Sequence, residues 1–360
     1  MISFDNARSY ARIRRELAEN PRTWLVTGVA GFIGSNLLEE LLALDQHVVG
    51  LDNFSTGHQE NLDDVMAAAE QSAGSFRMIR GDIRDLDACR TACKGVDFVL
   101  HQAALGSVPR SIDDPVTSTS VNVNGFLNVL LAARDSGVKR VVYASSCAIY
   151  GDADALPLAE ECTGNLLSPY AATKLTNELY ASVFQRTYEL PIVGLRYFNV
   201  FGPRQDPNGA YAAVIPRWIA NLLDGDTCQI FGDGETSRDF CYVANVAQAN
   251  FLAALSREPV SRSPVYNVAC GRETTLNELF RMIRLGLAGY EPSIASARPV
   301  YAPDRRGDIR RSMADISAIE RDLEYQTGFT TAQGLGQTVK WYVSRAAEGS
   351  AIDERATASV

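Results

Sequence analysis

The sequence has 360 residues, of which 46% are hydrophobic and 21% charged, with a formal net charge of −9 and a pI near 5.0. This length and composition suit a large globular core. The acidic balance argues against nucleic acid or an anionic membrane surface as a partner. No apolar run approaches the ~20 residues of a membrane-spanning helix. The polar segment 1–20 lacks the apolar core of a signal peptide, so we expect a cytoplasmic protein.

The seven cysteines are scattered along the chain without a Cys-x-x-Cys pair, and the chain has only three histidines. Because a metal site needs clustered ligands, we expect none here. The odd number and scattered positions of the cysteines favour reduced thiols.

The first elements form a strand, a tight turn and a helix. We expect residues 1–20 to form a helical extension, after which the apolar run Trp24–Val26 predicts a buried parallel strand. Glycines follow at positions 28, 31 and 34, and then leucines recur at helical spacing. The first glycine permits the tight turn, the second lets a pyrophosphate approach the backbone, and the third lets the helix pack close to the strand. The helix N-terminus would then bind the phosphates.

A second strand, Val48–Asp52, ends in a carboxylate 18 residues after Gly34. A carboxylate at this place binds the adenosine ribose hydroxyls and repels a 2′-phosphate, which favours NAD over NADP. The alternative is a strand-end cap. The polar loop Asn53–Gly57 suits the surroundings of an adenosine.

Three more strands complete an alternating pattern of strands and helices. Residues 78–85 predict the third strand and its loop, in which Asp82 and Ile83 would contact adenine, or alternatively form a surface turn. Residues 96–104 predict the fourth strand, whose small C-terminal residues leave room for a cofactor. A helical segment follows from about Val116, and residues 141–146 predict the fifth strand. This alternation predicts a doubly wound parallel sheet.

The candidate chemical centre is Tyr170-x-x-x-Lys174, preceded by Pro169, which favours a helix start. Four residues place the two side chains on one helix face. A nearby ammonium favours the phenolate, so Tyr170 could act as a base, with Ser146 hydrogen-bonding the same substrate hydroxyl. The alternative is an ordinary amphipathic helix.

These motifs, together with Leu195–Asn199, are similar to those of the extended short-chain dehydrogenases/reductases, over about residues 20–345. The segments 102–111 and 205–216 most resemble the bacterial UDP-N-acetylglucosamine 4-epimerases of surface-polysaccharide pathways. The resemblance implies bound NAD, a 4-keto intermediate, and Ser146, Tyr170 and Lys174 as catalytic residues. It also implies a homodimer through helices near 116–135 and 169–188.

The resemblance divides the chain into an NAD-binding domain, 21–199 with a return near 240–268, a smaller α/β substrate lobe, 200–345, and a tail, 346–360. The cofactor-binding residues expected from motif and resemblance are Gly28, Gly31, Phe32, Ile33, Gly34, Asp52, Asn53, Ser55, Thr56, Gly57, Asp82, Ile83, Gln102, Ala103, Ala104, Asn122, Tyr170, Lys174 and Tyr197. The expected substrate-binding residues are Gly106, Ser107, Ser146, Cys147, Tyr170, Asn199, Ala213, Val214, Ile230, Phe231, Arg238, Arg305, Asp308 and Ser312.

Residue size indicates the sugar. Where relatives specific for hexoses carry a bulky tyrosine, this chain has Ser312, and Gly106 is also small, so a 2-acetamido group should fit. Cys147 and Ala148 lack the acidic side chains that a dehydratase or decarboxylase needs. Two alternatives stay open: a 4-epimerase of the corresponding uronic acid, with Arg110 facing the carboxylate, and a non-catalytic NAD-binding sensor.

Overall fold

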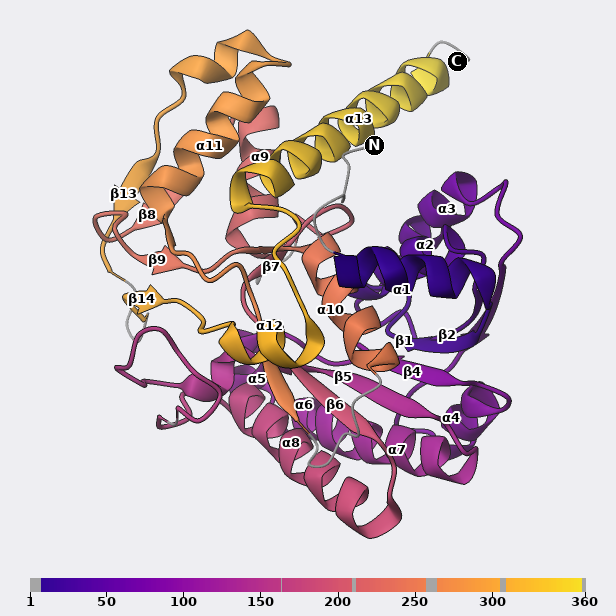
Figure 1. The fold of residues 1–360 in the computed structure, drawn as a ribbon. Helices are drawn as coiled ribbons and strands as arrows, with labels where there is room; N and C mark the ends of the chain where they lie inside the picture. Colours follow the sequence, from indigo (N-terminus) through magenta and orange to yellow (C-terminus); the bar gives the residue numbers. More distant parts are fainter. Residues whose placement is uncertain (1–7, 163, 209–211, 257–263, 305–308, 358–360) are drawn as a thin grey trace.

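The computed structural model describes residues 8–162, 164–208, 212–256, 264–304 and 309–357, and its centre is a parallel sheet (Figure 1). The seven strands lie in the order β11-β6-β5-β4-β1-β2-β3, and every neighbouring pair is parallel. The strands are β1 (Thr23–Thr27), β2 (His47–Asp52), β3 (Ser75–Arg80), β4 (Phe98–His101), β5 (Arg140–Ser146), β6 (Ile192–Tyr197) and β11 (Val265–Val268). The structure confirms the predicted doubly wound sheet.

Helices cover both faces of this sheet, because strands buried on both sides must find apolar partners above and below. In Figure 1, α1, α2 and α10 lie above the sheet and α7 and α8 lie below it. The helices of the first face are α1 (Arg8–Glu19), α2 (Phe32–Leu42), α3 (Gln59–Ala68), α10 (Val243–Leu255) and α12 (Ser317–Leu323). Those of the second face are α4 (Leu86–Cys93), α7 (Gly125–Asp135) and α8 (Pro169–Tyr188).

The direction of winding reverses between β1 and β4, which are neighbours in the sheet although β2 and β3 separate them in sequence. The chain leaves these two strands toward opposite faces, so a crevice opens beyond their carboxyl ends, where ligands of such sheets bind. The glycine turn follows β1, and the small residues Ala103 and Ala104 follow β4.

The helical segment expected from about Val116 is interrupted. It consists of α6 (Pro115–Thr119), a π-helical turn at Ser120–Asn124 and α7. A shorter helix, α5 (Val108–Asp113), precedes it, with the Ser107 hydroxyl accepting from the Arg110 N–H at its start. The Tyr170–Lys174 helix, α8, begins at Pro169 with Ser168 as its cap.

The C-terminal lobe lies beside the carboxyl end of the sheet and has its own hydrophobic core (Figure 1). Its helices are α9 (Val214–Leu223), α11 (Leu276–Ala288) and α13 (Thr331–Thr357), with a 3₁₀ turn at Pro292–Ser296. Its short strands are β7 (Val200–Phe201), β8 (Gln229–Phe231), β9 (Ser237–Arg238), β10 (Cys241–Tyr242), β12 (Thr274–Thr275), β13 (Val300–Ala302) and β14 (Arg311–Ser312), and a second 3₁₀ turn covers Cys147–Tyr150 beside the sheet.

The first and last described helices extend the fold beyond the sheet and the lobe. Helix α1 buries Tyr10, Ile13 and Leu17 against the first face of the sheet, beside α10. Helix α13 continues to Thr357, so the segment 346–360, expected to be a tail, is helical over most of its length. None of the helices within the described ranges is both long and apolar enough to cross a membrane.

Candidate active site

The three glycines of the turn after β1 have different surroundings. Gly28 has a φ of +69° and donates its N–H to the Leu51 carbonyl at 2.8 Å. A Cβ at Gly34 would lie 2.0 Å from the Gly28 carbonyl oxygen, so only glycine lets α2 begin this close to the turn. A Cβ at Gly31 would meet only the Gly28 oxygen, at 3.2 Å, which leaves its other side open to the crevice. The turn therefore has the shape that a pyrophosphate requires.

Asp52 binds the turn at the end of β2. Its Oδ2 accepts from the Ala30 N–H at 2.9 Å and its Oδ1 from the Phe54 N–H at 2.8 Å. The carboxylate is thus a strand-end cap, the alternative left open by the sequence, and it also lines the adjacent cavity. Each carboxylate oxygen has a second lone pair, which leaves acceptors for ribose hydroxyls.

A cavity of about 320 Å³ lies over the glycine turn and the ends of β1, β2 and β4. Most of the expected cofactor-binding residues line it, namely Gly28, Gly31, Phe32, Ile33, Gly34, Asp52, Asn53, Ser55, Thr56, Asp82, Ile83, Gln102, Ala103 and Ala104. Gly106, expected at the sugar, lies here too, and Leu51, Gly81, Leu105 and Val121 complete the lining. The phosphate cradle, the ribose acceptor and the narrow apolar floor together fit NAD.

Asp82 lies at the edge of this cavity and is held by its neighbours. It accepts hydrogen bonds from the Asn53 amide and from the Arg84 backbone and guanidinium, at 2.7–3.0 Å. The Arg84 hydrogen bonds hold the pKa of the carboxyl at about 2. Asp82 is therefore a permanent acceptor at the rim, next to the buried side chain of Ile83.

Five expected cofactor residues do not line the cavity, namely Tyr170 and Lys174, described below, and Gly57, Asn122 and Tyr197. Gly57 packs against the turn, since a Cβ there would lie 2.8 Å from Ala30. Asn122 is buried in the π-helical turn. Its Oδ1 accepts from the Leu105 N–H at 2.8 Å, and its Nδ2 donates to the Leu105 carbonyl at 3.2 Å. Tyr197 donates to the Gln102 side chain at 3.1 Å. These last three residues support the wall of the cavity.

The side chains of Ser146, Tyr170 and Lys174 come together beyond the end of β5. Tyr170 lies in the first turn of α8, where its backbone N–H donates to the buried Ser111 hydroxyl at 3.0 Å. Lys174 follows one turn later, with its Nζ 5.8 Å from the centre of the Tyr170 ring. The Nζ donates to the Ala144 carbonyl at 2.8 Å, which fixes α8 to β5.

Burial governs the acidity of this cluster. It raises the pKa of Tyr170 to about 12, whereas the hydrogen bond with Ser146 lowers it. The sequence suggested that Lys174 would lower the pKa of the phenol, but in the structure burial outweighs any such effect. Burial also lowers the pKa of Lys174 to about 8, and Glu178 acts in the opposite direction. The pKa of the ammonium therefore lies closer to neutral than that of an exposed lysine.

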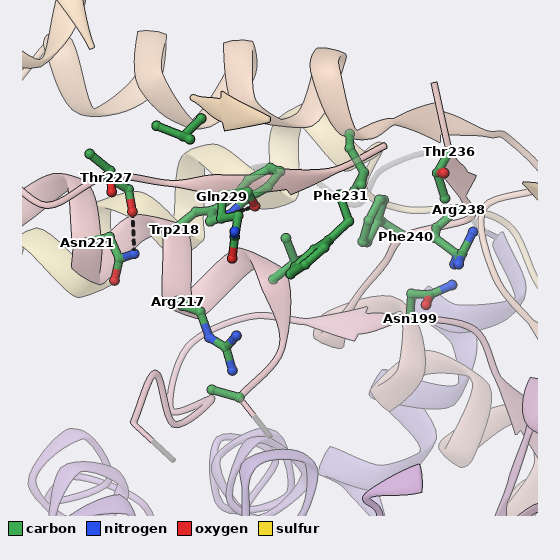
Figure 2. A pocket seen from close by; sticks show the side chains of 14 residues that line it. Asn199, Arg217, Trp218, Asn221, Thr227, Gln229, Phe231, Thr236, Arg238 and Phe240 are labelled. Carbon is green, nitrogen blue, oxygen red and sulfur yellow. Dashed lines mark hydrogen bonds between the residues drawn. The ribbon is translucent and has the colours of Figure 1, made fainter. Parts of the chain in front are cut away.

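A second cavity, of about 510 Å³, lies within the C-terminal lobe and reaches Asn199, just after the end of β6 (Figure 2). Apolar side chains such as Trp218, Phe231 and Phe240 form its walls. Figure 2 shows Arg238 and Asn199 pointing toward each other at one end, and Asn221 beside Thr227 at the other. An aromatic base fits between such walls, and the arginine and amide suit phosphate oxygens, so the cavity fits a nucleotide diphosphate.

The lining of this cavity differs in part from the expected residues. Val214, Phe231, Arg238 and Asn199 line it, but Ile230 is wholly buried in the core of the lobe. Side chains alternate along β8, so Phe231 and Gln229 share the cavity face and Ile230 has the opposite one. Ala213 caps the start of α9 and is exposed.

Three lining residues that the sequence analysis did not predict lie on one face of α9. Arg217, Trp218 and Asn221 follow Val214 at intervals of three, four and seven residues, the spacing of one helical face. That periodicity is visible in the sequence and could have identified them. The other added lining residues are Ala212, Thr227, Gln229, Thr236, Phe240, Leu276 and Val300.

The remaining expected sugar contacts either do not line the second cavity or fall outside the described residues. The Cys147 thiol interacts with the Asn199 backbone and lies in the field of Arg238, and burial raises its pKa to about 11. Ser312 on β14 pairs with Arg238 on β9, and Ser107 caps α5. Arg305 and Asp308 fall outside the described residues. In the part of the chain that the structure describes, no three metal-ligating side chains gather.

The chain belongs to the NAD dependent epimerase/dehydratase family, whose model matches residues 24–269. NAD is therefore its cofactor. A UDP-glucose 4-epimerase of Mycolicibacterium smegmatis is 38% identical over 88% of this chain and 97% of its own length. UDP-glucuronate 4-epimerase 4 of Arabidopsis thaliana is 31% identical over 94% of this chain and 78% of its own. The solved UDP-N-acetylglucosamine 4-epimerase of Methanobrevibacter ruminantium M1, in complex with UDP-N-acetylmuramic acid, is 39% identical, with a TM-score of 0.82 over 90% of this chain and 99% of its own.

Replacement of Gly34 by alanine tests the phosphate cradle. We expect Gly34→Ala to purify with at least about tenfold less bound NAD, because the new Cβ would displace the Gly28 carbonyl and open the turn. The NAD content of the purified protein measures this. Gly336→Ala is the control, since a Cβ there meets nothing within 4 Å. Full NAD content in Gly34→Ala would contradict the proposed cradle.

Proposed function

We propose that this protein is an NAD-dependent 4-epimerase of UDP-N-acetylhexosamines that interconverts UDP-GlcNAc and UDP-GalNAc. The observation that carries the proposal is the place of Tyr170. On one side, Lys174 is close enough to His101 to lower the pKa of that imidazole, and His101 bonds Thr27 beside the glycine turn. On the other side, Tyr170 lies in the field of Cys147, which is next to Asn199 of the second cavity. A base between a dinucleotide site and a nucleotide-sugar site suits oxidation of a sugar hydroxyl.

Each residue of the site has its own role in the proposed 4-epimerisation. NAD, which the residues lining the first cavity would hold, would supply a hydride acceptor and donor for C4 of the sugar and a positive ring that favours the Tyr170 phenolate. Tyr170 takes the proton of the 4-hydroxyl and later gives it back to the ketone oxygen. Ser146 orients that oxygen, and the Lys174 ammonium stabilises the phenolate. Arg238 and Asn199 hold the diphosphate, so the 4-keto sugar can turn without leaving.

The small side chain at Ser312 supports an N-acetylated sugar. Ser312 is paired with the diphosphate arginine Arg238, and Gly106 has nothing within 4 Å of the place where a Cβ would be. A small side chain at position 312 and the open space at Gly106 suit a 2-acetamido group. A uronic acid is the second candidate, favoured by the half-buried Arg110 one turn after Gly106. We further propose a cytoplasmic role in the synthesis of a surface polysaccharide.

Turnover of UDP-sugars by the purified protein, without added NAD, tests the proposal. We expect interconversion of UDP-GlcNAc and UDP-GalNAc, weaker action on UDP-glucose, and little on the uronic acid. Tyr170→Phe should lower the rate by about 10²–10⁴-fold, the usual contribution of a general base, with NAD still bound. Tyr188→Phe, at the exposed end of the same helix, is the control. Bound NAD with no turnover of any sugar would contradict the proposal and favour a sensor.

A bulky residue at position 312 tests the selectivity. We expect Ser312→Tyr to lower kcat/KM for UDP-GlcNAc by at least about tenfold and to leave UDP-glucose turnover within a few-fold, because the ring fills the space of the acetamido group. Ser296→Tyr, on an exposed turn of the C-terminal lobe, is the matched control. Equal losses with both sugars would show that Ser312 does not set the selectivity.

We propose that two copies pair through α6 and α8. The two helices pack beside each other and leave apolar side chains exposed, with Val116 at 78% and Leu179 at 62% exposure, and Val183 follows one turn later. We expect Leu179→Glu/Val183→Glu to change the protein from dimer to monomer in light scattering after gel filtration. Leu285→Glu, at an equally exposed leucine on α11, should leave the mass unchanged. A wild-type monomer would rule the pairing out.

A further inference from the structure

The face of α8 that carries Tyr170 and Lys174 continues to Glu178, one turn further along the helix. Glu178 is 9% exposed, and no expectation from the sequence included it. A buried carboxylate is stable only where opposite charge or hydrogen-bond donors compensate the loss of water. Its partners therefore indicate what it does.

Glu178 binds the two central strands that end at the catalytic cluster. Its Oε1 accepts from the Ser145 hydroxyl at 2.6 Å and from the Arg196 Nε at 3.0 Å, and its Oε2 accepts from the Arg196 Nη2 at 2.8 Å. Ser145 on β5 and Arg196 on β6 are register partners, so one carboxylate fixes both strands to α8. This two-point contact with a planar guanidinium is the strongest geometry available to such a pair.

Each of these partners is the immediate neighbour of a residue at the site. Ser146 follows Ser145, and Tyr197, which bonds Gln102 of the NAD cavity, follows Arg196. Lys174 lies one turn before Glu178 and donates to Ala144 of the same strand β5. The distance between the helix that carries the base and the strand that carries its serine thus depends on Glu178.

The pair also connects the catalytic helix to the segment that leads from Ser312. Arg196 Nη1 donates to the Tyr150 hydroxyl at 3.0 Å, and Tyr150 donates to Asn267 Oδ1 at 2.5 Å. The Asn267 amide in turn donates to the Asp315 carbonyl at 2.9 Å. The network therefore reaches the sugar end of the site.

We propose that Glu178, through Arg196 and Ser145, is a positioning residue that holds Lys174 and Ser146 at the distance that proton transfer at Tyr170 requires. The inference rests on the proposed epimerase function. Glu178 lines neither cavity, and among the described residues its carboxylate bonds only Ser145 and Arg196, so we expect its loss to change the chemical step and not the binding of the nucleotide sugar.

The charge of Glu178 also acts on Lys174, whose pKa it raises against the effect of burial. His101 stays neutral, because burial lowers its pKa to about 3. The titratable and charged groups around the pair are Tyr170 on α8, His101 on β4, Tyr143 on β5 and Arg196 on β6. Removing the carboxylate takes away the negative charge that raises the pKa of Lys174 and leaves Arg196 as an uncompensated cation nearby. Both effects lower the pKa of Lys174 and favour loss of its proton. The alkaline limit of activity should move to lower pH.

The experiment measures kcat, KM and the pH profile of UDP-sugar turnover for the full-length wild type and Glu178→Gln. We expect kcat to fall by about 10- to 100-fold, the scale of a small misplacement of catalytic groups, with KM within a few-fold. The alkaline limb should move down by about one pH unit. Bound NAD should stay near one per chain, as in the wild type.

The control is Glu160→Gln in the same network. Glu160 accepts the Asn267 N–H at 2.8 Å, a bond that an amide oxygen can replace, and we expect its kcat and alkaline limb to match those of the wild type. If Glu178→Gln does not fold, Ser145→Ala decides: it removes one bond and keeps the ion pair, and we expect a lower kcat at unchanged KM. The inference would be overturned if Glu178→Gln kept the wild-type kcat and the wild-type alkaline limb. If Glu178→Gln does not fold, a wild-type kcat in Ser145→Ala would overturn it. A loss of kcat in Glu160→Gln as large as that in Glu178→Gln would also overturn it. An inactive wild type would instead refute the proposed function.

Discussion

The closeness of α2 to the turn after β1 is the constraint on which the rest of the molecule depends. With no side chain at Gly34, the helix starts against the Gly28 carbonyl, and its free N–H groups face the crevice. That crevice exists because the chain leaves β1 and β4 in opposite directions. Asp52 then ties the turn to β2 through the Ala30 N–H. The phosphate site, the ribose acceptor and the sheet edge are thus parts of one arrangement of backbone.

The chemical centre lies at the same edge of the sheet, but its acid–base properties depend on burial. Strand β5 carries Ser146 and α8 carries Tyr170 and Lys174; Ser146 and Lys174 are buried, and Tyr170 is half-buried. Burial moves the pKa of the phenol upward and that of the ammonium downward, so burial opposes the charged form of each group. A site with this balance responds strongly to any positive charge that arrives beside it. Catalysis and cofactor binding are therefore linked by electrostatics as well as by position.

Sequence patterns predicted the sheet and the centres of its elements well, because glycine spacing, apolar strands and a Tyr-x-x-x-Lys pair are local signals. They predicted orientation less well. Ile230 was expected at the substrate together with Phe231, but the alternation along β8 places Gln229 and Phe231 at the cavity and Ile230 in the core. Asn122 supports the wall of the NAD cavity from a π-helical turn, and the hydrophobic periodicity of the sequence does not predict such a turn. Glu178 gains its meaning only from Arg196, 18 residues away, and contacts of that kind are set by the fold.

The path of the chain between the two lobes has a consequence for any attempt to recombine them. The chain leaves the sheet after β6, returns through α10 and β11, and leaves again for α11, while α1 packs beside α10. Neither lobe is a continuous stretch of sequence. A new sugar specificity could therefore not be introduced by exchanging the C-terminal half as a cassette, because the exchange would remove an edge strand and a covering helix from the NAD-binding sheet. Diversification of this architecture must proceed through single side chains on the short strands and loops of the lobe.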